Sequence, residues 1–198
     1  MTRITHADLT RGDHRWREAP MPGANRGIEL VRLDSTGDTF AILGRFPAGF
    51  ERVRPGGYLA GEEFIVLTGF LDLEGVRRHP GDLTYVPPRF LRTDMRAPEG
   101  CTVLAWFGGP AVFRPAEQLD GAVMDGIVTV SVKGAAAGPL LSTPGADWVV
   151  HAPGEPVTEA EGDSVDVGLT WWHRLAAGAP AGPGDGGRVV RVVRVQRG

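Results

Sequence analysis

The sequence predicts an all-β protein, a small sandwich or barrel built from short strands. The chain of 198 residues contains 29 glycines and 16 prolines, which are disfavoured inside helices and common in turns. Short apolar runs recur along the chain, and Gly, Pro or Asp separates nearly every pair of them. Because 42% of the residues are hydrophobic, these runs are expected to be strands around a real core.

The strand signals of the first half follow a polar stretch. Residues 1–25 show little periodicity, and a turn is expected at 34–38 between the first two apolar runs. Strands are expected at 28–33, 39–46, 63–73, 83–86, 91–96 and 102–107.

The second half contains the one helix candidate, a short segment at 115–124. A loop is expected at 176–187, where Gly, Ala and Pro dominate. Arginines recur at every third position from Arg188, a pattern that favours a charged edge strand or a dimer contact. Further strands are expected at 126–132, 148–151, 165–175 and 189–195.

Charge and cysteine content exclude several classes of protein. The net charge is −3 with no block of like charges, which argues against nucleic-acid binding through a basic surface. No apolar run approaches the ~20 residues of a membrane span, and residues 1–17 lack the apolar core of a signal peptide. Cys101 is the only cysteine, so we expect a structural thiol, no Cys-based zinc site, and a cytoplasmic protein.

Two segments resemble the motifs of the cupin superfamily. Residues 61–69, Gly-Glu-Glu-Phe-Ile-Val-Leu-Thr-Gly, are similar to the first motif of the cupin domain in anti-sigma factors and related dioxygenase-like proteins. Residues 81–88, Gly-Asp-Leu-Thr-Tyr-Val-Pro-Pro, resemble the start of the second motif. The resemblance implies a cupin-type β-barrel or jelly roll with additional C-terminal strands. The implied organisation is a lead-in at 1–25, a barrel at 26–114 and a β-rich extension or degenerate second cupin at 115–198.

The metal ligands that this resemblance implies are mostly absent. Cupin histidines correspond here to Pro55, Gly57 and Arg92, and the cupin glutamate corresponds to Glu62. A first-row metal needs three or four N, O or S ligands, so Glu62 alone cannot hold one, and the guanidinium of Arg92 repels a dication. We therefore expect no metal and no other cofactor, and an Arg92 that pairs with Glu62.

Acidic and basic side chains are then the candidates for chemistry. Glu62 is a candidate general acid or base, and Arg92 a candidate for binding a carboxylate or oxyanion; a structural ion pair in a dead site is the alternative. His173, beside tryptophans on an expected apolar face, is a third catalytic candidate, with a core histidine as its alternative. The candidate substrate-binding residues are Arg52, Arg54, Phe64, Tyr85, Asp94, Trp106 and Trp171.

The sequence favours a metal-independent enzyme that isomerises, cyclises or dehydrates a small, largely apolar metabolite in specialised biosynthesis. A homodimer without nucleic-acid or membrane partners is expected. A non-catalytic ligand-binding or regulatory cupin is one alternative, although the residues before the first expected strand are too few for the helical partner-binding segment of anti-sigma cupins. A pseudoenzyme that assembles with an active homologue is another, and an open pocket would count against it.

Overall fold

Strands dominate the structure, a computed structural model. Every regular element in the described residues is a strand, except for one short 3-10 turn. The all-β prediction is therefore confirmed. None of the helical residues described forms a segment long and apolar enough to cross a membrane. The residues that the structure describes are 4–33, 39–156, 162–175 and 187–193.

The chain divides into two compact units. The barrel unit consists of Asp13–Thr129, and the second unit combines Met1–Gly12 with Val130–Gly198. The organisation expected from the sequence, with a barrel at 26–114, stays a prediction. The turn expected at 34–38 and residues 176–186 of the expected loop lie outside the described residues.

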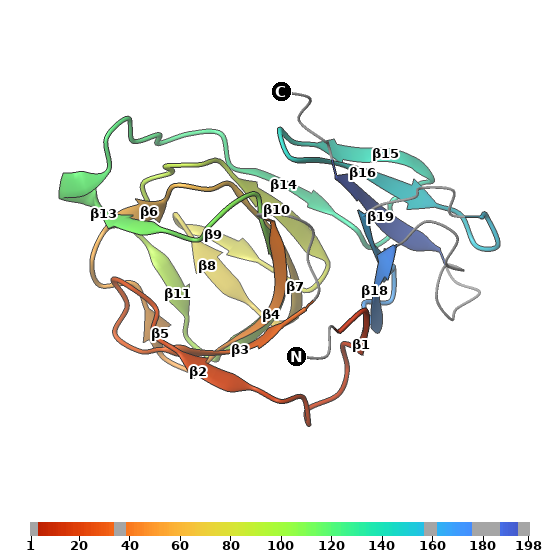
Figure 1. The fold of residues 1–198 in the computed structure, drawn as a ribbon, viewed down its shortest axis with the longest axis horizontal. Coiled ribbons are helices and arrows are strands. Elements are labelled where there is room, and N and C mark those ends of the chain that lie inside the picture. The colour runs from red at the N-terminus through yellow and green to blue at the C-terminus, as the bar shows by residue number, and fades with distance from the viewer. Residues whose placement is uncertain (1–3, 34–38, 157–161, 176–186, 194–198) are drawn as a thin grey trace. The chain divides into compact units, whose positions relative to one another are not determined.

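Two sheets face each other in the barrel unit, as in a jelly roll (Figure 1). The larger sheet has the order β14 (Val128–Ser131), β10 (Asp82–Val86), β7 (Glu62–Gly69), β12 (Cys101–Phe107), β4 (Phe40–Phe46), β3 (Ile28–Arg32) and β2 (Arg17–Ala19). The smaller sheet has the order β5 (Phe50–Glu51), β11 (Met95–Ala97), β8 (Leu71–Leu73) and β9 (Val76–Arg78). A separate ribbon pairs β13 (Phe113–Pro115) with β6 (Gly56–Tyr58).

One apolar cluster connects the two sheets. Successive side chains of a strand point to opposite faces, so β7 contributes Phe64 and Val66 to this cluster, and β10 contributes Val86. The smaller sheet contributes Leu71, Leu73, Met95 and Ala97. The inner face of the larger sheet is thereby defined, and it is the face on which the candidate site lies.

The predicted strand at 63–73 is two strands in different sheets, β7 and β8. Between them Gly69 has a φ of 68°, a conformation that glycine adopts without steric cost. A Cβ at Gly69 would also lie 2.2 Å from the carbonyl oxygen of Gly100. Gly69 therefore lets the chain leave the larger sheet and enter the smaller one, which periodicity alone does not indicate.

Two further element predictions are wrong. The helix expected at 115–124 is only the 3-10 turn η1 (Ala116–Gln118), and Gly121, at a φ of 65°, interrupts the segment soon afterwards. The strand expected at 91–96 begins only at Met95, because Arg92 belongs to an isolated bridge with Gly56.

The second unit contains one six-stranded sheet. Its order is β1 (His6–Asp8), β18 (Trp171–Leu175), β17 (Gly162–Asp166), β19 (Arg188–Val193), β16 (Ala146–His151) and β15 (Gly138–Ser142). Because β19 lies between β17 and β16, the expected edge strand is wrong. Arg191 on β19 is buried and ion-paired with Asp163 at 3.8 Å, so a charged residue belongs to the interior of this sheet.

Candidate functional site

Glu62 and Arg92 form a buried ion pair in the barrel unit. Arg92 Nη2 donates to Glu62 Oε2 at 2.6 Å. The Arg92 side chain is 3% exposed and that of Glu62 is 12% exposed. Glu62 begins β7 and shares the inner face with Phe64. The pair expected from the cupin motif spacing is thus present, on the side of the sheet that faces the apolar core.

Two backbone hydrogen bonds hold the segment of Arg92 close to the segment of Gly56. Arg92 N donates to Gly56 O at 2.9 Å, and Gly56 N donates to Arg92 O at 3.2 Å. A Cβ at Gly56 would lie 2.4 Å from the Phe113 ring, so a side chain at this position would separate the segments. The guanidinium carbon of Arg92 lies 5.0 Å from the ring centroid of Tyr58, a cation–π contact.

A second buried arginine, Arg52, lies near Arg92. Its Nη1 donates to Pro22 O at 2.8 Å, and its Nη2 approaches Met95 Sδ at 3.9 Å. Its guanidinium also contacts the Phe113 ring, with 4.9 Å between carbon and centroid. Burial lowers the pKa of Arg52, and the positive charge of Arg92 lowers it further. The direct partners of this cation are neutral groups.

Tyr58 lies within the electrostatic influence of both arginines, and sequence reasoning missed it. The Tyr58 hydroxyl donates to Met21 Sδ at 3.4 Å. Burial raises the pKa of Tyr58, while the charge of Arg92 opposes the rise. We call Arg52, Tyr58, Glu62 and Arg92 the interior polar cluster. No spacing rule singles out Tyr58; its place directly after Gly57, in the segment that carries ligands in cupins, was the only signal.

The residues at the cupin ligand positions do not fit a metal ion. Pro55 offers no side-chain donor, and the guanidinium of Arg92 is itself a cation. Gly57 has no side chain, and a Cβ there would lie 2.3 Å from the carbonyl oxygen of Phe90. Within the described part of the chain, no group of three or more His, Cys, Asp or Glu could hold a metal ion.

Three of the predicted substrate-binding residues lie in the barrel unit but outside the interior polar cluster. Phe64 belongs to the apolar core beside Glu62. Arg54 is an exposed side chain that pairs with Glu117. Asp94 pairs with Arg96 at 2.8 Å at the protein surface. Asp94 does not share a continuous strand with Arg92, because Arg92 belongs to an isolated bridge and β11 begins only at Met95.

Tyr85 and Trp106 point away from the interior polar cluster. The register places both opposite Glu63, on neighbouring strands. Glu62 is paired instead with Val86 and Phe107, both members of the apolar core. Each of the two residues lies one position out of phase with the inner face, so Phe107 rather than Trp106 is the member of its pair on that face.

His173 and Trp171 belong to the second unit, so the structure does not bring them together with Glu62 in one unit. The expected apolar alternation from Val165 to His173 is interrupted by a hairpin between β17 and β18. His173 lies in stacked contacts, with ring centroids 6.2 Å from His6 and 6.3 Å from Trp171. Burial lowers the pKa of His173, and the neighbouring His6 and Arg188 lower it further.

His173 is expected to make the stability of the protein pH-dependent. Its folded pKa lies below its unfolded value of about 6.5, so the unfolded state binds more protons as the pH falls through this range. By linkage, stability is retained above pH 6.5 and is lost as the pH falls toward the folded pKa. A His173→Gln variant should therefore show a smaller fall in urea midpoint between about pH 7 and about pH 5. An identical fall in both proteins would contradict this role.

Cys101 lies at the start of β12 and belongs to the apolar core. Burial raises the pKa of its thiol to about 12, and the thiolate is the reactive form. We expect a disulfide reagent such as DTNB to label native protein at pH 8 at least ~100-fold more slowly than urea-unfolded protein. Immediate stoichiometric labelling of the native protein would show that the thiol is accessible.

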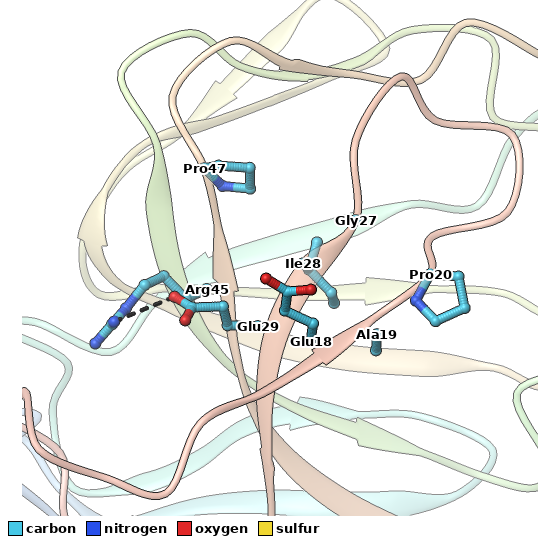
Figure 2. A pocket seen from close by; sticks show the side chains of 8 residues that line it. All are labelled: Glu18, Ala19, Pro20, Gly27, Ile28, Glu29, Arg45 and Pro47. Carbon is cyan, nitrogen blue, oxygen red and sulfur yellow. Dashed lines mark hydrogen bonds and ion pairs between the residues drawn. The ribbon is translucent and has the colours of Figure 1, made fainter.

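A surface hollow of about 630 Å³ lies on the barrel unit, lined from β2, β3 and β4 (Figure 2). Figure 2 shows Glu18 and Glu29 at this hollow, with Arg45 paired to Glu29 at 3.3 Å. None of the residues of the interior polar cluster lines it. The carboxylates and the guanidinium at this hollow are partly exposed, whereas those of the interior polar cluster are buried.

Comparison with known proteins identifies the fold. No family model matches the chain, and no curated protein sequence matches it. A structure from Nostoc punctiforme named "putative dioxygenase" has a TM-score of 0.70 at 11% identity, over 97% of this chain and 82% of the other. A "putative glyoxylate induced protein" from Pseudomonas aeruginosa has a TM-score of 0.58 at 11% identity, over 91% and 85%.

A cupin 2 conserved barrel domain protein from Salinispora arenicola is also similar, at 24% identity and a TM-score of 0.33 over 40% of this chain and 74% of the other. The first two of these structures, which match nearly the whole chain, show that its all-β fold is of the cupin type. At these identities the likeness shows the fold alone. What distinguishes this chain within the fold is its own ligand positions, which hold proline, glycine and arginine beside Glu62.

Proposed function

We propose that this chain is a metal-independent enzyme that catalyses a non-redox isomerisation, cyclisation or lyase step on a small, largely apolar molecule. The observation that carries the proposal is the Glu62–Arg92 pair, with 2.6 Å between Nη2 and Oε2. It lies on the inner face of the barrel, where the cupin motifs place metal ligands. In the proposed enzyme, the carboxylate base Glu62 and the fixed cation Arg92 take the place of the metal.

The proposed chemistry is proton transfer next to a carbonyl group. Glu62 takes a proton from the substrate carbon. The electron pair of the broken C–H bond forms a carbon–carbon double bond, and the carbonyl π pair moves onto the oxygen to give an enolate. Arg92 stabilises that oxyanion, because its guanidinium is already in place and already charged. Return of the proton from Glu62 to another carbon completes an isomerisation. Departure of a leaving group from the neighbouring carbon completes a lyase step.

The apolar surroundings of Glu62 and Arg92 strengthen the electrostatic interactions on which this chemistry depends. Phe64, Val86 and Phe107 lie on the inner face around Glu62. Electrostatic interactions between Arg92 and a developing oxyanion are stronger in such surroundings than in water. The same side chains suit a substrate that is largely apolar.

Deuterium exchange tests the proposal. Wild-type protein with EDTA is expected to accelerate exchange at the carbon beside the carbonyl of phenylpyruvate in D2O, followed by NMR. Glu62→Gln should lose at least ~100-fold of this acceleration, the usual contribution of a general base. Glu29→Gln, which changes a carboxylate on the outer surface of the same unit, is the matched control and should exchange like the wild type.

Three results would contradict the proposal. Glu62→Gln could exchange as fast as the wild type while circular dichroism shows both folded. EDTA could abolish the exchange, with a stoichiometric transition metal found in the purified protein. Finally, wild-type protein could give no acceleration, which would favour a non-catalytic ligand-binding cupin.

The expected homodimer remains a proposal, which sedimentation of the purified protein can test.

A further inference from the structure

The interior polar cluster contains more positive than negative charge. Arg52 and Arg92 supply two buried guanidinium groups, and Glu62 supplies one carboxylate, so the formal charge is +2 − 1 = +1. The Glu62 carboxylate is already bonded to Arg92 at 2.6 Å. Arg52 has the neutral partners described above and no carboxylate within ion-pair distance in the described residues. Burying a cation without an anionic partner is costly.

The donors of this cluster also lack strong acceptors. The Tyr58 hydroxyl donates to the sulfur of Met21, and Arg52 Nη2 approaches the sulfur of Met95. Thioether sulfur is a weak acceptor. The Nε atoms of Arg52 and Arg92 are both buried without a hydrogen-bond partner. Charged and hydroxyl donors thus gather where the residues that the structure describes provide no second carboxylate.

We infer that the interior polar cluster binds the carboxylate group of a small organic acid, with Arg52 and Arg92 as its cationic donors and Tyr58 as a third donor. This inference rests on the proposed function, because it names the class of substrate for the same site. Guanidinium groups match the planar geometry of a carboxylate. The ligand would supply the acceptors for which Met21 and Met95 are poor substitutes.

The charge and the surroundings select a monoanion with an apolar remainder. One negative charge balances the surplus of +1, whereas a phosphate dianion would exceed it next to the carboxylate of Glu62. Aromatic side chains adjoin the cluster: the Tyr58 ring lies edge-to-face with Phe107 and with Phe113, each with 5.6 Å between centroids. An aryl or alkyl carboxylate therefore fits this site better than an inorganic anion.

Calorimetric titration of the full-length protein tests the inference, with 3-phenylpropionate as the probe. The wild type should bind 3-phenylpropionate at least about tenfold more tightly than the neutral 3-phenylpropionamide or inorganic phosphate. Arg52→Met should weaken binding of 3-phenylpropionate by at least about tenfold. Arg54→Met is the matched control, because Arg54 is two residues away but exposed, and its affinity should stay at the wild-type value.

A second variant keeps the test valid if Arg52→Met does not fold. Arg52→Lys retains the charge but not the planar fork, so it should bind 3-phenylpropionate more weakly than the wild type. Wild-type affinity in Arg52→Lys or Arg52→Met would overturn the inference. Equal affinity for acid and amide, tighter binding of phosphate, or no binding of 3-phenylpropionate up to about 10 mM would also overturn it.

The binding and exchange experiments can fail separately. Glu62→Gln removes a negative charge beside the ligand, so it should bind 3-phenylpropionate at least as tightly as the wild type while it loses deuterium exchange. Binding without exchange in the wild type would overturn the proposed enzyme but support the carboxylate site. Exchange that persists unchanged in Arg52→Met, with no binding of 3-phenylpropionate, would support the enzyme and overturn the carboxylate site.

Discussion

Glu62→Gln is expected to destabilise the protein more than Arg92→Met, although each change removes one partner of the same ion pair. In Glu62→Gln the two buried guanidinium groups face no carboxylate, and the cluster charge rises from +1 to +2. In Arg92→Met the charge falls to zero, because the cluster then contains one guanidinium, that of Arg52, and one carboxylate, that of Glu62, which interact at longer range. Loss of one partner from a buried pair costs about 3–5 kcal/mol. We expect that range for Glu62→Gln and about 1–2 kcal/mol for Arg92→Met.

Urea unfolding of a double-mutant set measures this difference. The double variant Glu62→Gln/Arg92→Met returns the cluster charge to +1, so it should be more stable than Glu62→Gln alone. Glu29→Gln and Arg45→Met form the control pair, since their ion pair at 3.3 Å is largely exposed. Each control should change stability by less than about 1 kcal/mol. If Arg92→Met were the more damaging single change, the surplus positive charge would have no energetic effect.

Gly57→Ala is expected to destabilise the segment that borders the interior polar cluster. Its Cβ would lie 2.3 Å from the carbonyl oxygen of Phe90, an atom of the backbone that cannot rotate away. Insertion of a carbon into such a contact costs about 1–3 kcal/mol or more. Urea unfolding should show this loss, while Gly108→Ala should be tolerated because the nearest atom to its Cβ is 3.8 Å away.

The same obstacle predicts that the cupin ligand set cannot be restored by substitution alone. Pro55→His/Gly57→His places histidines at two cupin ligand positions, but the clash at Gly57 opposes the fold and Arg92 still holds a positive charge at the third position. We expect no stoichiometric zinc binding by equilibrium dialysis. Tight zinc binding to a well-folded variant would show that the Gly57 backbone moves readily.

The longer strands were predictable because their apolar runs extend over more than one two-residue strand period. The cores of β3, β4, β10 and β12 fall where short apolar runs lie between turn residues. Strands of two or three residues, such as β5 and β6, were missed because so few positions carry no readable alternation. The division of 63–73 into two strands depends on the packing of Gly69 against Gly100, a long-range contact without a local signal.

Only those residues of the site that occupy a defined position in a cupin motif were predictable. Glu62 and Arg92 were paired correctly because each stands at a defined place in a cupin motif. The sequence left open whether Trp106 or Phe107 faces the interior, because successive residues of a strand point to opposite faces and only the register decides between them. Arg52 was a candidate, but its burial beside Arg92 and the position of Tyr58 near both arginines were not readable.

The sequence by itself determined the strand-rich class, the cupin resemblance and the replacement of ligand residues at Pro55, Gly57 and Arg92, because turn residues, strand periods and residue chemistry are local properties. The tertiary structure alone decided that Arg52 is buried and that its direct partners among the described residues are neutral. Burial and charge balance arise from segments distant in the sequence, here around Met21, Tyr58 and Met95. The pattern of residues within one segment does not show which charged side chains of other segments will lie beside it.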